Sequence, residues 1–194
     1  MKKRILYGIS GSFCNLANIL QPLKQLCEIY DVQVVISDNI KQMDTRFFKA
    51  KDYVGLLQQI TKHPVIDCLQ EAEKVGPLYH FDMMVIAPMT STCCAKLVHG
   101  IYDHNVTLAA KAMLRNNKNI LFGIACNDGL GISGENIFKL MNMRNIYVIP
   151  FSQDDPLKKQ RSIVSHFDLL LECVECTLRN EQLQPIIRQK MDKR

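Results

Sequence analysis

Five short apolar runs, each followed by a turn signal and a helical pattern, constrain the fold of this chain more than any other feature. The runs cover residues 5–7, 32–36, 83–87, 120–125 and 146–149. Strands that alternate with helices along a chain form parallel sheets, because each crossover helix returns the chain to the same edge of the sheet. The sequence therefore predicts an α/β sandwich of three layers, in which a parallel central sheet lies between two layers of helices.

The run at residues 83–87 carries no polar side chain. An uninterrupted apolar run of this length is typical of a central strand whose two faces are both buried. We expect Pro88 to end this strand, because proline has no N–H group to donate to a neighbouring strand.

Apolar residues at helical spacing locate the expected helices. They lie after Cys14, over 53–60, over 106–114 and over 163–178. Pro22 falls inside the first helix, which predicts a kink or a late start there. Residues 38–51 and 129–134 are expected to be loops at strand ends, the edge where ligands bind in open parallel sheets.

Size and composition favour one folded domain. The chain has 194 residues, of which 47% are hydrophobic and 22% are charged, far from the profile of a disordered chain. We expect a single domain over residues 1–194, with a C-terminal tail from about residue 185. The net charge of +5 is spread over separate segments, so no nucleic-acid footprint is predicted.

The first residues and the cysteines bear on the compartment. The apolar run at residues 5–7 is too short for the core of a signal peptide or for a membrane span. The 8 cysteines are therefore expected to be reduced thiols, most of them packed as small apolar side chains. We expect a cytoplasmic protein with no membrane partner.

The loop after the first strand, residues 8–13, reads GISGSF and precedes a helix. Glycine and serine in such a turn expose backbone N–H groups and hydroxyls to an anion, which predicts a phosphate-bearing ligand. The loop has neither the third glycine of the dinucleotide motif nor the Gly-Lys-Ser/Thr of a P-loop. A tight turn that merely needs glycine is the alternative.

Hydroxyl side chains follow two further strands. Thr90, Ser91 and Thr92 come after the central strand, and Ser37 ends the second strand. One hydroxyl is enough to cap a helix, so three in a row favour a ligand contact over a set of scattered caps. Together with the first loop they predict one polar ligand at one edge of the sheet.

The sequence around these loops resembles the FMN-binding flavoprotein family. The similar stretches are residues 8–12, 87–92 and, above all, 96–116, which reads KLVHGIYDHNVTLAAKAMLRN. This family includes phosphopantothenoylcysteine decarboxylases, lantibiotic cysteine decarboxylases and flavin prenyltransferases. The resemblance implies a Rossmann-like fold, an FMN cofactor and a homo-oligomer built on trimers.

Further stretches resemble one narrower group of this family. They are residues 45–47, 127–131, 140–142, 145–159 and 183–186. This resemblance implies an oxidoreductase subunit that helps to oxidise a dihydropyridine or tetrahydropyridine dicarboxylate to dipicolinate during sporulation. It also implies a partner, the A subunit of the same synthase, that binds NAD(P), and a location in the mother cell of a spore-forming bacterium.

The resemblance also implies which residues contact the flavin. They are Gly11, Ser12, Phe13, Ser37, Thr90, Ser91, Thr92, Cys93 and Asn127. For the implied dicarboxylate substrate, Arg46 is our candidate contact, because a guanidinium matches a carboxylate bidentately. A solvated loop arginine is the alternative at Arg46, and no catalytic residue is assigned.

Two other functions stay open: a stand-alone FMN-dependent decarboxylase or prenyltransferase, and a non-catalytic scaffold that has lost flavin. The substrate motif P-x-M-N-x-x-M-W of the decarboxylases is absent, and Asn127 stands where the prenyltransferases have arginine. No metal site is predicted, because nothing completes a ligand set around His99 and His104. Cys173 and Cys176 fall inside a predicted helix, where packing is favoured over a redox motif.

Overall fold

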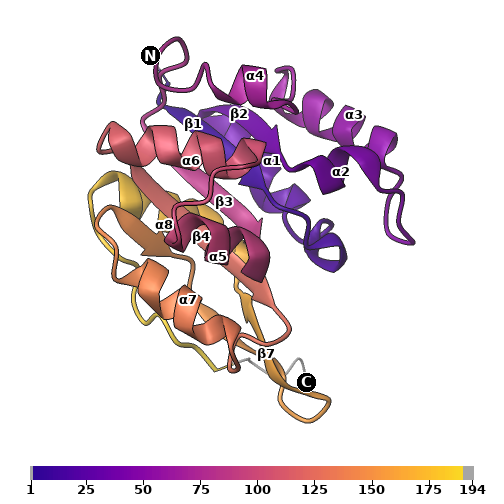
Figure 1. Ribbon diagram of the computed structural model, residues 1–194, viewed down its shortest axis with the longest axis vertical. Helices are drawn as coiled ribbons and strands as arrows, with labels where there is room; N and C mark the ends of the chain where they lie inside the picture. Colours follow the sequence, from indigo (N-terminus) through magenta and orange to yellow (C-terminus); the bar gives the residue numbers. More distant parts are fainter. Residues whose placement is uncertain (1, 190–194) are drawn as a thin grey trace.

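The computed structural model describes residues 2–189 as a parallel sheet between two layers of helices (Figure 1). The parallel strands are β1 (Arg4–Ile9), β2 (Asp31–Ile36), β3 (Met83–Met89), β4 (Asn119–Cys126) and β5 (Ile146–Val148). Their order is β2-β1-β3-β4, and β5 pairs with the first half of β4. The predicted α/β sandwich with a parallel central sheet is confirmed.

The two helical layers cover opposite faces of the sheet. One layer contains α1 (Leu20–Ile29), α3 (Ala50–Thr61) and α8 (Leu170–Leu178), and the other contains α4 (Leu69–Ala72), α5 (Ser91–Val98), α6 (Asn105–Arg115) and α7 (Ser133–Met141). Figure 1 shows α5, α6 and α7 in front of the sheet and α8 behind it. Within residues 2–189, no helix is long and apolar enough to cross a membrane.

Alternation along the strands divides the core into these two halves. Leu6 and Met84 face the layer that contains α6, whereas the preceding residues, Ile5 and Met83, face the layer that contains α1. All four side chains are fully buried. Burial of side chains of this size stabilises a fold by about 1.5–3 kcal/mol each, so the apolar strand pattern accounts for the layers.

The central strand β3 is buried along its whole length, as predicted, but the expectation that Pro88 ends it is wrong. The strand continues to Met89 through a cis Ala87–Pro88 peptide bond, and its register with β4 shifts between Ile86 and Met89. At such an irregularity the missing N–H of proline leaves no ladder bond unmade. The Pro88 carbonyl meanwhile accepts hydrogen bonds from the Ser10 backbone N–H and hydroxyl.

The expected helix over residues 163–178 is also wrong in its first half. A hairpin of β6 (Phe151–Asp155) and β7 (Lys159–Ser165) precedes a short 3₁₀ helix, η2 (Phe167–Leu169), and α8. β7 runs antiparallel to the end of β4, where Val164 pairs with Ala125. Ile163 and Val164 are β-branched and favour extended backbone, a preference that the apolar spacing had concealed.

Two smaller differences concern the region after β1 and the region after β2. A 3₁₀ turn, η1 (Phe13–Asn15), comes before α1, and α1 begins at Leu20, so Pro22 lies in its first turn and the predicted late start is confirmed. The expected loop at 38–51 contains a short helix, α2 (Asp38–Gln42). Its N-cap position, Ser37, is the residue that ends β2.

The chain after α8 returns to the sheet. The Gln182 side chain accepts from the Val148 N–H and donates to the Val148 carbonyl, both at 2.8 Å, and so serves as a partner for β5. The Phe151 N–H donates to the Ile186 carbonyl, and the Arg188 N–H donates to the Phe151 carbonyl. The expected tail from about residue 185 thus begins as a paired segment, and its last residues, 190–194, lie outside the described part of the chain.

Candidate functional site

The carboxyl ends of β1, β2 and β3 lie side by side and are joined by hydrogen bonds. The Ser10 hydroxyl accepts from the Thr90 N–H at 2.9 Å and donates to the Pro88 carbonyl at 3.2 Å. On the other side of β1, the Ser37 N–H donates to the Ile9 carbonyl at 3.0 Å. The hydroxyl-rich ends of these three strands are therefore held at one edge of the sheet, as the sequence predicts.

An anion-binding cradle forms between β1 and β2 at this edge. Gly11 has a φ of +99°, a conformation that side chains with a Cβ rarely adopt, and a Cβ built on it would lie 3.7 Å from the Ser37 Oγ. The Ser37 hydroxyl is buried and has no hydrogen-bond partner among the described residues. A buried hydroxyl without a partner costs about 1–3 kcal/mol, so this atom favours a ligand that would accept its proton.

The third strand end caps α5. The Thr90 Oγ1 accepts from the Cys93 N–H at 3.2 Å, which is a conventional N-cap. Burial raises the pKa of the Cys93 thiol to about 12, and its side chain is enclosed. Contacts from this turn to a ligand therefore fall to Ser91 and Thr92, in the first turn of α5, where backbone N–H groups have no helical acceptor.

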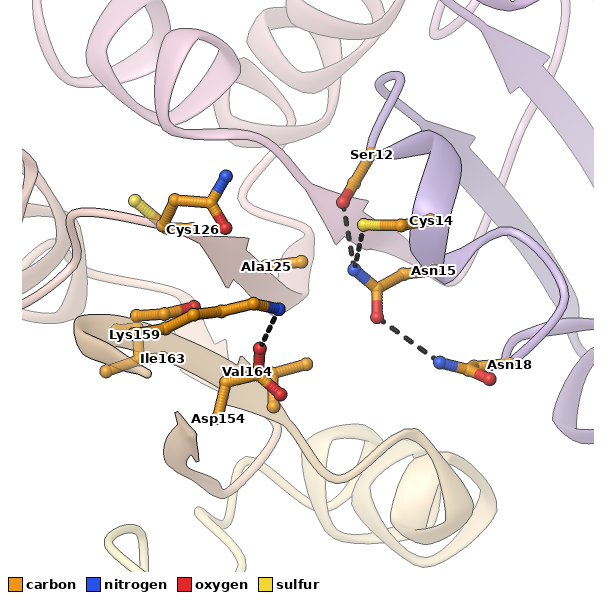
Figure 2. Close-up of a pocket in the computed structure, with 12 residues that line it drawn as sticks. Ser12, Cys14, Asn15, Asn18, Ala125, Cys126, Asp154, Lys159, Ile163 and Val164 are labelled. Atoms are coloured by element: carbon orange, nitrogen blue, oxygen red, sulfur yellow. Dashed lines mark hydrogen bonds and ion pairs between the residues drawn. The ribbon is translucent and has the colours of Figure 1, made fainter. Parts of the chain in front are cut away.

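A pocket of about 270 Å³ opens beside this edge (Figure 2). Its volume is just below the roughly 300–1,000 Å³ of typical small-molecule sites. It is lined by the segment after β1, the end of β4 and the hairpin: Ser12, Cys14, Asn15, Asn18, Ala125, Cys126, Asn127, Asp154, Lys159, Ser162, Ile163 and Val164. The lining thus comes from three segments that are far apart in the sequence.

The turn after β4 is fixed by Asp128. Its carboxylate accepts from the Cys126 thiol at 3.0 Å and from the Ser133 hydroxyl at 2.9 Å. These two hydrogen bonds, that from Cys126 first, hold the pKa of Asp128 below its usual value. The carboxylate therefore stays ionised near neutral pH and positions Asn127 beside the pocket.

The hairpin contributes an ion pair to the pocket. The Lys159 Nζ lies 2.8 Å from the Asp154 Oδ2, and this hydrogen bond raises the pKa of the lysine. Sequence reasoning missed both residues because it placed no hairpin here. The signal that could have found them is the Asp155–Pro156 turn between two short stretches that contain β-branched or aromatic residues.

The structure brings some of the predicted site residues together and leaves others apart. Ser12 and Asn127 line the pocket, and Phe13, half-buried, packs against the core next to it. Arg46 is exposed, its guanidinium lies 4.8 Å from the centroid of the Phe47 ring, and it does not line the pocket. Among residues 2–189, no three His, Cys, Asp or Glu side chains gather in a way that could hold a metal.

Comparison with known proteins places this fold and site in a family. Residues 1–172 match the flavoprotein family, so the chain belongs to it. The chain is 40% identical to the B subunit of dipicolinate synthase from Bacillus subtilis over 186 residues, which cover 95% of this chain and 93% of the relative.

Solved structures agree with this assignment. The crystal structure of the B subunit of dipicolinate synthase from Bacillus halodurans has a TM-score of 0.89 and 37% identity, with 97% of each chain covered. SpaF, described as an FMN-dependent cysteine decarboxylase, has a TM-score of 0.65 at 17% identity, with 92% of this chain and 96% of SpaF covered. The likeness to SpaF is one of fold alone.

Proposed function

We propose that this chain is the flavoprotein component of an enzyme that forms dipicolinate, an oxidoreductase whose activity requires a second component, the A subunit of dipicolinate synthase. The observation that carries this proposal is the 40% identity to the B subunit of that synthase over 95% of the chain. The absence of the decarboxylase substrate motif and of any tryptophan weighs against cysteine decarboxylation. The reaction is the oxidation of a dihydropyridine or tetrahydropyridine dicarboxylate to the aromatic pyridine.

The cofactor proposed for this chain is FMN, and the residues at the sheet edge fit it. Gly11, Ser12 and Ser37 would hold the phosphate, because their N–H groups and hydroxyls border the cradle that contains the partnerless Ser37 Oγ. The remaining proposed contacts are Phe13, Thr90, Ser91, Thr92, Asn127 and, if the Thr90 cap opens, Cys93. Bound FMN would supply a hydride acceptor next to the pocket.

The protein's own part in this reaction is modest. Formation of an aromatic ring drives the oxidation, so the chain has to bind the substrate, orient it and neutralise its carboxylates. Arg46 remains our candidate for one such contact on the basis of its guanidinium chemistry. NAD(P) bound to the A subunit is proposed as the electron acceptor outside this chain.

The assembly and location follow the same proposal. We propose a homo-oligomer built on trimers that associates with the A subunit in the cytoplasm of the mother cell. Support for a partner comes from the relatives, which are named as one subunit of a synthase. A structural neighbour is described as a dodecameric FMN-dependent decarboxylase, at 19% identity.

The test uses the full chain purified alone and together with the A subunit. We expect dipicolinate to form from the reduced pyridine dicarboxylate when both proteins, FMN and NAD(P) are present, and each omission to lower the rate at least tenfold. The measurement is the appearance of the pyridine absorbance. Unchanged dipicolinate formation by the A subunit without this chain would contradict the proposal.

Two other results would identify the alternatives. Release of CO₂ from a substrate by this chain alone would identify a decarboxylase. A colourless protein that fails to bind added FMN, yet raises the activity of the A subunit, would identify a scaffold.

A further inference from the structure

The pocket beside the cradle carries very little charge for a site that would receive a dicarboxylate. Of the residues that line it, only Asp154 and Lys159 have ionisable acid or base side chains other than thiols. The others offer amides, hydroxyls, thiols and apolar groups. Lys159 is therefore the lining residue whose charge can neutralise a carboxylate in this pocket.

The position of Lys159 allows it to change partners. It begins β7 on the hairpin, and its side chain reaches across the opening toward Asn15, where its ammonium meets Asp154 (Figure 2). The Lys159 side chain is 56% exposed. Exposed ion pairs add little to stability, so a ligand carboxylate can take or share the ammonium at small cost.

The opposite side of the pocket presents a matching row of polar groups. The Asn15 Nδ2 donates to the Ser12 Oγ at 3.1 Å, and the Asn18 Nδ2 donates to the Asn15 Oδ1 at 3.3 Å. Because the Ser12 oxygen accepts from Asn15, its own hydrogen is left to donate elsewhere. The Ser12 hydroxyl and the Lys159 ammonium thus offer donors to one pocket from two sides.

We propose that this pocket contains a carboxylate subsite, in which Lys159 and the polar row of Ser12, Asn15 and Asn18 bind one carboxylate of a pyridine dicarboxylate. The inference rests on the proposed function and assigns a residue that binds the substrate. In the absence of ligand, Asp154 holds the ammonium at the opening of the pocket. Asp154 consequently competes with the ligand for Lys159.

The subsite is tested by calorimetry on the full chain in metal-free buffer, with pyridine-2,6-dicarboxylate and pyridine-2-carboxylate as probes. We expect the wild type to prefer the dicarboxylate. Lys159→Gln should weaken dicarboxylate binding about tenfold and remove the preference, because a charge-assisted hydrogen bond is lost. Asp154→Asn should leave that affinity unchanged or strengthen it, because the competing carboxylate is gone.

Lys158→Gln is the matched control, since Lys158 is the exposed neighbour on the hairpin and does not line the pocket. It should bind both probes as the wild type does. Equal binding by Lys159→Gln and the wild type would overturn the subsite, and so would a wild type that binds neither probe, alone or in the presence of the A subunit.

Kinetics in the presence of the A subunit separate this inference from the proposed function. If dipicolinate forms, Lys159→Gln should raise KM about tenfold and leave kcat within a factor of about two. A normal KM in that variant would reject the subsite and leave the proposed function intact. A wild-type chain that forms no dipicolinate with its partner would reject the proposed function itself.

Discussion

At the scale of single residues, the cradle depends on small uncharged groups. Ser12 and Gly11 border a space in which the Ser37 hydroxyl has no described partner. A ligand phosphate would meet N–H and O–H donors here, whereas a side-chain carboxylate would repel it.

We therefore expect Ser12→Asp to lower the affinity for FMN at least tenfold, measured by calorimetry on the full chain. Ser12→Asn is the control, because it adds a group of similar size without charge, and it should lose clearly less affinity. Equal FMN affinity for the wild type and Ser12→Asp would place the phosphate elsewhere.

His104 sets a pH dependence at a helix end. Its Nδ1 accepts from the Thr107 N–H at 3.4 Å as the N-cap of α6, a contact that requires a neutral ring. Burial, followed by the nearby charge of Lys96, lowers the pKa of His104, although Asp103 and Asp38 oppose the shift. The unfolded chain therefore binds this proton more readily than the folded chain.

Stability from His104 is thus complete above its unfolded pKa of about 6.5 and is lost as the pH falls through the lower folded value. We expect the free energy of unfolding of the wild type to fall relative to His104→Asn between pH 7.5 and pH 5, by about 1 kcal/mol, the worth of a cap. Urea unfolding at the two pH values measures this difference. His80→Asn, at an exposed position, is the control, and a constant difference between the wild type and His104→Asn would contradict the assignment.

At the scale of elements, the layer that contains α8 approaches the sheet at a glycine in β4. A Cβ on Gly123 would lie 2.9 Å from the Phe167 Cε1, 3.0 Å from the Ile149 Cδ1 and 3.2 Å from the Ala87 Cβ. Gly55 in α3 is the reverse case, because a Cβ there would meet nothing within 4 Å.

We expect the two glycines to respond to alanine with opposite signs. Gly123→Ala should lower the free energy of unfolding by about 1–3 kcal/mol through overpacking. Gly55→Ala should raise it by roughly 0.5–1 kcal/mol, because glycine is a poor residue inside a helix. Thermal unfolding of both variants decides the point, and a loss of stability in Gly55→Ala would show that α3 is packed more closely than described.

The same elements show what sequence alone could predict. The five parallel strands were found because each is a short buried apolar run, and Ser37 and Thr90 could be expected together because parallel strands end at one edge. The hairpin was missed because β6 and β7 are partly polar and exposed, and because β7 is held by Ala125 and Cys126 from a distant part of the chain. Local periodicity carries no information about such a partner.

At the scale of the whole molecule, the cradle and the pocket belong to different parts of the fold. The cradle lies where β1 and β2 end, inside the parallel sheet, whereas Lys159 and Asp154 stand on the hairpin. Lys159 was therefore beyond prediction, because its position at the pocket exists only when the hairpin is docked.

The antiparallel hairpin meets the rest of the described sheet through Val164 and Ile163, which pair with Ala125 and Cys126, while its turn at Pro156 and Leu157 is exposed. Residues at that turn can be exchanged during evolution with little penalty to folding. A descendant of this protein could thus acquire a new substrate by rewriting a dozen or so positions, while the grip on its anionic cofactor is inherited unaltered.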